Sequence, residues 1–152
     1  MTDEVRLNIF ADYHQFYLED GNSEADLTEI WDERTSADMI ATGPGVVGVG
    51  TARNYHVPVT VRMLDSEPEE DLGRWDHVTE ASLAVPSGRL LVSGPTEWPD
   101  VRRIAIKPGH YRAQTWRVWP RMGSTATTSM RWCSGRVRRN HLGCLTGRRL
   151  PE

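Results

Sequence analysis

The sequence predicts an all-β protein, an antiparallel β-sandwich of seven to eight strands with at most one short helix. Several segments alternate apolar with polar residues, as half-buried strands do. Glycine and proline turn signals separate these segments, and only residues 26–41 have apolar residues at helix-like spacing. The chain shows no repeat of 20–50 residues, so a propeller or a solenoid is disfavoured.

The clearest strand pattern lies in residues 57–63, where valine or methionine occupies every odd position. Pro58 lacks an N–H group and is therefore expected at a sheet edge or facing away from the ladder. Residues 5–13 repeat the alternation and end at Tyr13, while Phe10 interrupts the polar face. This strand is therefore expected to be covered on both sides.

Shorter β-rich runs supply the remaining strands, with tight turns at Pro86-Ser87-Gly88 and Pro108-Gly109 between some of them. The loose apolar spacing in residues 26–41 predicts a single helical turn or a short helix. The runs expected as strands are 46–52, 78–85, 89–93, 101–107 and 110–119.

Charge divides the chain near residue 119. Residues 1–118 hold 20 acidic and 11 basic residues, a net charge of −9, whereas residues 119–152 hold seven arginines and one acid, a net charge of +6. We therefore predict an acidic sandwich domain, 1–118, and a basic, disordered tail, 119–152. The tail composition is typical of a phosphate-binding arm or of a frameshifted GC-rich reading frame, and both interpretations stay open.

Compartment and metal chemistry follow from the cysteines and the apolar runs. Cys133 and Cys144 both lie in the tail, so the acidic domain cannot form a disulfide, which suits the cytoplasm. No apolar run approaches the ~20 residues that span a bilayer, and the N-terminus lacks the apolar core of a secretory signal. With His141 the two cysteines make three ligands, one short of a structural zinc site, so neither a metal nor a cofactor is expected.

Residues 43–50 contain a G-x-G-x-x-G pattern of the kind that binds dinucleotides. That function requires a helix after the loop, and here β-branched residues follow instead. The pattern therefore predicts a turn entering a strand whose glycines allow close approach of other groups.

An acidic run at residues 65–71 is the first candidate partner-binding site. It lacks the glycine and the glutamate that an EF-hand calcium loop requires at its sixth and twelfth positions. It is expected either as a solvated hairpin loop or as a patch that attracts a basic protein. Its carboxylates are Asp65, Glu67, Glu69, Glu70 and Asp71.

Catalysis is not expected. Asp12 and His14 would share one face of a continuous strand and could touch, but no nucleophile with a local signature accompanies them. His110 is the other histidine around which an enzyme site could form.

The segment Tyr13-His14-Gln15-Phe16 resembles the opening motif of the competence protein J (ComJ) nuclease-inhibitor family. Later features are similar in order: a strand from Gly45 that ends in Arg53-Asn54, a strand carrying Arg62, and a closing strand with Gly109, Tyr111 and Trp116. The resemblance covers residues 5–118. The acidic run and the tail depart from the family pattern.

The resemblance implies a small β-sandwich, an immunity-type module that binds and inhibits a DNA-degrading nuclease. Its motif residues are expected to be structural: Tyr13 on the core face, Phe16 after a register change, Gly109 in a turn with positive φ and Trp116 between the sheets. An inhibitor predicts carboxylates on one face beside exposed aromatic residues, and an exposed pair among Trp31, Trp75, Trp98 and Trp116 would indicate an interface.

Three alternatives remain. The first is a small-molecule-binding sandwich with a closed apolar pocket and no catalysis. The second is an enzyme centred on His14 or His110. The third is weak nucleic-acid binding by the tail, since the acidic domain itself would repel nucleic acid.

Overall fold

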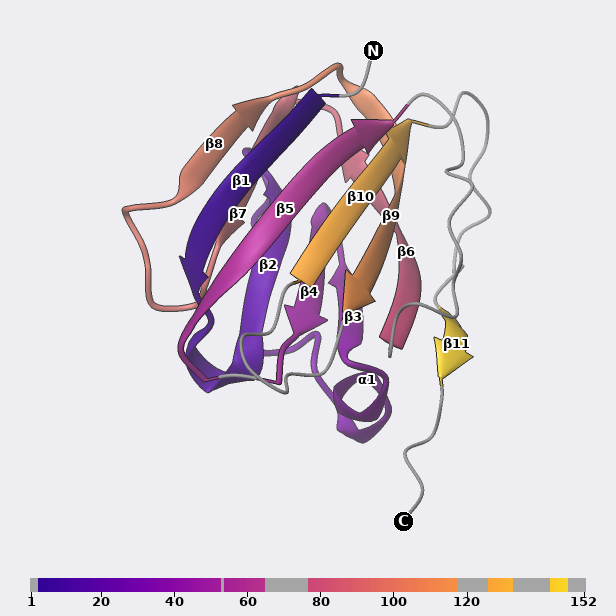
Figure 1. The fold of residues 1–152 in the computed structure, drawn as a ribbon. Helices are drawn as coiled ribbons and strands as arrows, with labels where there is room; N and C mark the ends of the chain where they lie inside the picture. Colours follow the sequence, from indigo (N-terminus) through magenta and orange to yellow (C-terminus); the bar gives the residue numbers. More distant parts are fainter. Residues whose placement is uncertain (1–2, 53, 65–76, 118–125, 133–142, 148–152) are drawn as a thin grey trace.

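Two β-sheets pack face to face in this protein (Figure 1). The computed structural model describes residues 3–52, 54–64, 77–117, 126–132 and 143–147. Within those residues the structure is mostly antiparallel strands with one short α-helix, α1 (Glu33–Asp38), which confirms the all-β fold class. No helix in these ranges is long and apolar enough to cross a membrane.

The larger sheet has six strands in the order β1-β5-β10-β9-β6-β11. Neighbouring strands are antiparallel except β5 and β10, which run parallel. The strands are β1 (Asp3–Phe10), β5 (His56–Leu64), β10 (Ala126–Trp132), β9 (Gly109–Arg117), β6 (His77–Val85) and β11 (Gly143–Gly147).

The smaller sheet has five strands in the order β3-β4-β2-β7-β8, all antiparallel. A short 3-10 turn, η1 (Asp12–His14), carries the chain from β1 in one sheet to β2 in the other. The strand expected over residues 5–13 therefore ends at Phe10. The strands are β3 (Ile40–Gly43), β4 (Val46–Gly50), β2 (Gln15–Asp20), β7 (Arg89–Ser93) and β8 (Arg102–Ala105).

The core lies between the sheets, where alternate residues of facing strands are buried. Val57, Val59 and Val61 of β5 point inward, as the alternation predicts, while Pro58 on the other face is exposed. Phe16 and Leu18 of β2 are buried in the same cluster. Each such side chain contributes about 1.5–3 kcal/mol relative to its exposed state, so the alternation holds the sandwich together.

The sheet does not stop at residue 118, where the sequence predicts the start of a disordered tail. β10 lies between β5 and β9, pairing Thr128 with Val61 on one side and with Thr115 on the other. β11 pairs with β6 at the sheet edge. Strand pairing is made by the backbone, so an arginine-rich composition does not prevent it. The division of the chain into a domain, 1–118, and a tail, 119–152, stays a prediction, as does a frameshift in the tail.

Candidate functional site

The η1 turn holds the resemblance motif in an unusual backbone conformation. Tyr13 and His14 are consecutive left-handed residues with φ of 56° and 59°, a state that costs a non-glycine residue on the order of 1–3 kcal/mol. The Tyr13 amide donates to Asn54 Oδ1 at 2.9 Å, and the Thr51 amide donates to the His14 carbonyl at 2.8 Å. The structure thus joins Tyr13 to Asn54 and turns the tyrosine outward, leaving it 70% exposed, so its expected place on the core face is wrong.

Asp12 supports a neighbouring loop. Its carboxylate accepts hydrogen bonds from the Tyr13 amide at 3.0 Å and from Thr96 Oγ1 at 3.1 Å. The expected Asp12–His14 alignment required a continuous strand, which η1 interrupts. The bond to Thr96 fixes the loop that follows β7, and that loop presents Trp98 with 71% of its surface exposed.

The connection between β2 and β3, residues 21–39, covers the outer face of β4. A Cβ placed on Gly48 would lie 2.8 Å from Trp31 Cζ2, and one on Gly43 would lie 2.8 Å from Ile30 Cγ2. Both distances are shorter than real Cβ contacts, so a side chain at either position would have to displace its neighbour. The glycine-rich segment 43–50 is therefore a turn and a strand whose glycines allow close approach, as expected, here of Ile30 and Trp31, and the next described element is the strand β5.

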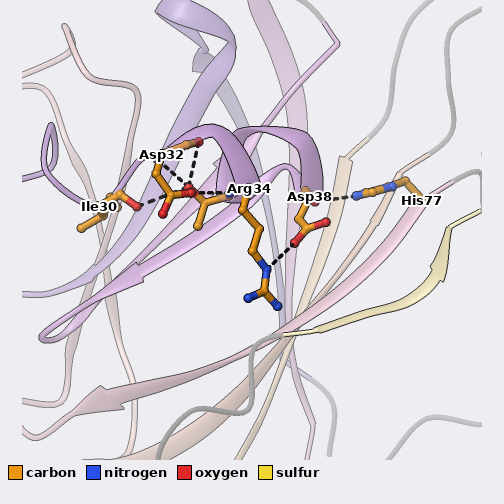
Figure 2. A network of polar contacts seen from close by, with 6 residues as sticks. Ile30, Asp32, Arg34, Asp38 and His77 are labelled. Carbon is orange, nitrogen blue, oxygen red and sulfur yellow. Dashed lines mark hydrogen bonds and ion pairs between the residues drawn. The ribbon is translucent and has the colours of Figure 1, made fainter.

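Polar contacts at both ends fix α1 beneath β3 and β4 (Figure 1; Figure 2). Asp32 and Thr35 form a capping box, with the Thr35 amide donating to Asp32 Oδ1 and the Asp32 amide to Thr35 Oγ1, each at 2.8 Å. At the other end, His77 Nε2 of β6 donates to the Asp38 carbonyl at 2.8 Å. Arg34 Nε lies 3.8 Å from Asp38 Oδ2.

Negative charge gathers on this segment, which we call the acidic connection (residues 21–39). It carries six carboxylates and one arginine. Hydrogen bonds from Thr28 lower the pKa of Asp26, and those from Thr35 lower the pKa of Asp32, so both carboxylates stay ionised well below neutral pH. The exposed basic residues Arg102 and Arg103 lie on β8, at the opposite edge of the five-stranded sheet.

A cleft of about 770 Å³ opens between the acidic connection and η1. Along it, Trp31 Nε1 donates to Tyr17 Oη at 3.0 Å, and Tyr17 Oη donates to Gln15 Oε1 at 2.6 Å. Burial raises the pKa of Tyr17, so its hydroxyl stays protonated and able to donate. The cleft is lined by Tyr13, His14, Gln15, Tyr17, Asp26, Leu27, Thr28, Trp31, Ser36, Met39, Gly50, Thr51 and Pro95.

Among the described residues, three large aromatic side chains are exposed, on η1 and on two segments hydrogen-bonded to Ala11 and Asp12. They are Tyr13, Tyr55 and Trp98, at 70%, 61% and 71% exposure. The Ala11 amide donates to the Tyr55 carbonyl at 2.9 Å, and the Tyr55 ring meets the Phe10 ring edge-on at 6.1 Å. Exposed tyrosine and tryptophan are the residues that dominate protein interfaces, so this group marks a candidate contact surface.

Other predicted site residues lie elsewhere. The Tyr111 hydroxyl donates to the Lys107 carbonyl and closes the turn before β9, where Gly109 has a φ of 157°. Trp116 is in β9 opposite Val78. Arg53 and the acidic run Asp65–Asp71 fall outside the described residues, as does Trp75.

Tyr17 and Asp26 were not predicted as site residues, and Trp31 was named only as one of four tryptophans whose exposure would indicate an interface. The acidic character of this segment could have been recognised from the sequence, because residues 24–38 contain six carboxylates and one base. The tyrosine and the tryptophan enter the site only through packing across β2 and β4.

Comparisons with known proteins bear on the fold. No family model matches this chain, and no curated protein matches it significantly in sequence. The crystal structure of ComJ from Bacillus subtilis, an inhibitor of the DNA-degrading activity of NucA, is similar with a TM-score of 0.71 at 15% identity, covering 88% of this chain and 99% of that one. A structure described as crocagin biosynthetic gene J is similar with a TM-score of 0.59 at 15% identity, covering 86% and 96%.

The chain therefore has a ComJ-like fold, as the sequence resemblance predicts. The 88% coverage is a larger share than residues 1–118 alone would provide, so the shared fold extends past the charge boundary.

Proposed function

We propose that this protein is a protein-binding module that inhibits a DNA-degrading nuclease. One observation supports the proposal most: exposed Tyr13 lines a cleft together with Asp26 of the acidic connection, which carries six carboxylates, and exposed Tyr55 and Trp98 lie on segments hydrogen-bonded to Ala11 and Asp12. The inhibitor hypothesis predicts carboxylates on one face beside exposed aromatic residues, and this grouping supports it. A nuclease that binds DNA presents a basic surface, and an acidic partner is complementary to that surface.

The proposed target, a DNA-degrading nuclease, follows from the ComJ-like fold, since ComJ is described as an inhibitor of the DNA-degrading activity of NucA. Such an inhibitor performs no catalysis and acts where its nuclease acts, here in the cytoplasm. The carboxylates Asp65, Glu67, Glu69, Glu70 and Asp71 are a further proposed part of the surface, on sequence grounds alone.

A small-molecule-binding sandwich is the second candidate, and the cleft favours it by volume, because ligand sites typically measure about 300–1,000 Å³. The inhibitor is the better account, since a pocket for a small molecule does not explain three exposed aromatic side chains outside a core. The two candidates differ in the size of the ligand they require.

Affinity capture from host lysate, with the full chain as bait at low and high salt, tests the proposal. We expect recovery of a basic nuclease, weaker recovery at high salt because surface charge is screened, and loss of that nuclease's DNA cleavage when the chain is added. A recovered nuclease that still cleaves DNA at full rate contradicts inhibition. A Trp98→Ala bait should recover at least ten-fold less nuclease, whereas Glu4→Gln at the far end of β1 should recover as much as the wild type.

A further inference from the structure

We propose that the cleft receives an arginine side chain of the protein partner. This inference rests on the proposed function for its choice of a protein as the ligand. It assigns the chemistry of the cleft, which the fold similarity leaves open.

The cleft walls favour a planar cation. Tyr13 and Trp31 line it, while the buried Tyr17 accepts a hydrogen bond from the Trp31 indole through its hydroxyl, and aromatic faces attract a cation within about 6 Å of the ring. Guanidinium also stacks on such rings and forms hydrogen bonds in its own plane. Tyr13 is 70% exposed at the cleft edge, so its ring is accessible to an entering side chain.

Charge around the cleft selects against anions. Among the described residues that line it, Asp26 is the carboxylate, and none is a lysine or an arginine. Asp26 accepts from the Thr28 amide at 2.9 Å and from Thr28 Oγ1 at 2.6 Å, both through Oδ1. A carboxylate has about four acceptor positions, so Asp26 can also accept from a guanidinium. The five other carboxylates of the acidic connection repel phosphate and carboxylate ligands.

The surroundings of the cleft indicate that the cation belongs to a protein. Trp98 and Tyr55 extend the contact surface beyond the cleft, where a free small cation would leave them uncovered. Arginine, tyrosine and tryptophan are the residues in which binding energy concentrates at protein interfaces.

A titration of the ¹⁵N-labelled full chain tests this inference without the partner. The probe is acetyl-Gly-Arg-Gly-amide, and the control is the same peptide with citrulline, which keeps the shape but lacks the charge. The reporter is the Trp31 indole N–H, identified by its loss in Trp31→Phe. We expect a saturable shift with the arginine peptide, with millimolar affinity, and at least ten-fold weaker binding of the citrulline peptide.

Two variants locate the site. Asp26→Asn retains an acceptor for Thr28 and removes one charge, and we expect it to weaken arginine-peptide binding about three- to ten-fold. Glu4→Gln, on β1 far from η1, makes the same charge change and should leave binding unaltered. Equal shifts with both peptides, or an unmoved Trp31 signal, overturn the inference.

The outcome separates this inference from the proposed function. If the chain inhibits a host nuclease and Asp26→Asn inhibits equally well, the cleft assignment falls and the function stands. If the arginine peptide binds as expected while no nuclease is inhibited, the cation site stands and the inhibitor proposal falls.

Discussion

Replacing Gly48 with alanine tests how the acidic connection is held on the sheet. The added Cβ would lie 2.8 Å from Trp31 Cζ2 and 3.2 Å from Ile30 Cδ1, so the indole must move. Such overpacking costs about 1–3 kcal/mol. Moving the indole also weakens its 3.0 Å hydrogen bond to Tyr17, which contributes about 0.5–1.5 kcal/mol. Replacing glycine with alanine also stabilises the fold by about 0.4–1 kcal/mol, because alanine restricts the unfolded chain.

The net expectation for Gly48→Ala is a loss of about 2 kcal/mol in the free energy of unfolding, or about 4–8 °C in Tm for a chain of this length. Urea unfolding followed by circular dichroism measures it. The control is the same substitution in a Trp31→Ala background, where most of the cost should vanish because the clashing ring is gone. An equal cost in both backgrounds, or a neutral Gly48→Ala, refutes this account of the packing.

Three further substitutions test other parts of the structure. Asp32→Ala removes the helix cap. Because the Asp32 pKa is lowered in the fold, the stability that the ionised Asp32 contributes is present above the unfolded pKa of about 3.9 and is lost as pH falls through the lower folded pKa. The urea midpoints of variant and wild type should therefore differ at pH 7 and converge at pH 2. Burial, and then the Asp20 charge, raise the pKa of Glu19, so the wild type loses stability as pH rises through that raised value. Glu19→Gln should therefore be more stable at pH 7, by less than about 1 kcal/mol because Glu19 is still partly exposed to screening solvent, and equal to the wild type at pH 3. Arg112→Met removes the guanidinium whose Nε lies 2.7 Å from Oε1 of the buried Glu80, and this should cost about 3 kcal/mol in the free energy of urea unfolding. Adding Glu80→Gln should recover most of that loss. The full cost in the double variant would contradict the ion-pair explanation.

The strand β5, which has one covered face, was predictable from its alternation, whereas β2, which is covered on both faces, was not; β4 is also buried on both faces, and its run of valines and glycines was still recognised as a strand. Residues 57–63 alternate because β5 buries only its inward side chains. In β2, by contrast, Phe16, Tyr17 and Leu18 are all buried, since the sandwich core covers one face and the acidic connection meets Tyr17 on the other. Burial on both faces erases the period-two pattern, and β2 was therefore missed.

The turn conformation and the cleft depend on tertiary contacts. No local signal predicts two consecutive left-handed residues at Tyr13 and His14. That backbone is held by residues about 40 positions away, since the Tyr13 amide donates to Asn54 Oδ1 and the Thr51 amide donates to the His14 carbonyl. β10 was overlooked for a similar reason: its pairing with β5 and β9 is made by the backbone, whereas the prediction weighed composition.

Inhibition of a host DNA-degrading nuclease by the purified full chain tests the central claim most directly. DNA cleavage is followed at increasing inhibitor concentration for the wild type, for Tyr13→Ala and for Trp98→Ala, with melting curves on each protein. We predict dose-dependent inhibition by the wild type, and at least ten-fold loss of potency in both variants without a change in Tm, because both side chains are about 70% exposed. Undiminished cleavage at saturating wild-type protein, or equal potency of all three proteins, would contradict the account.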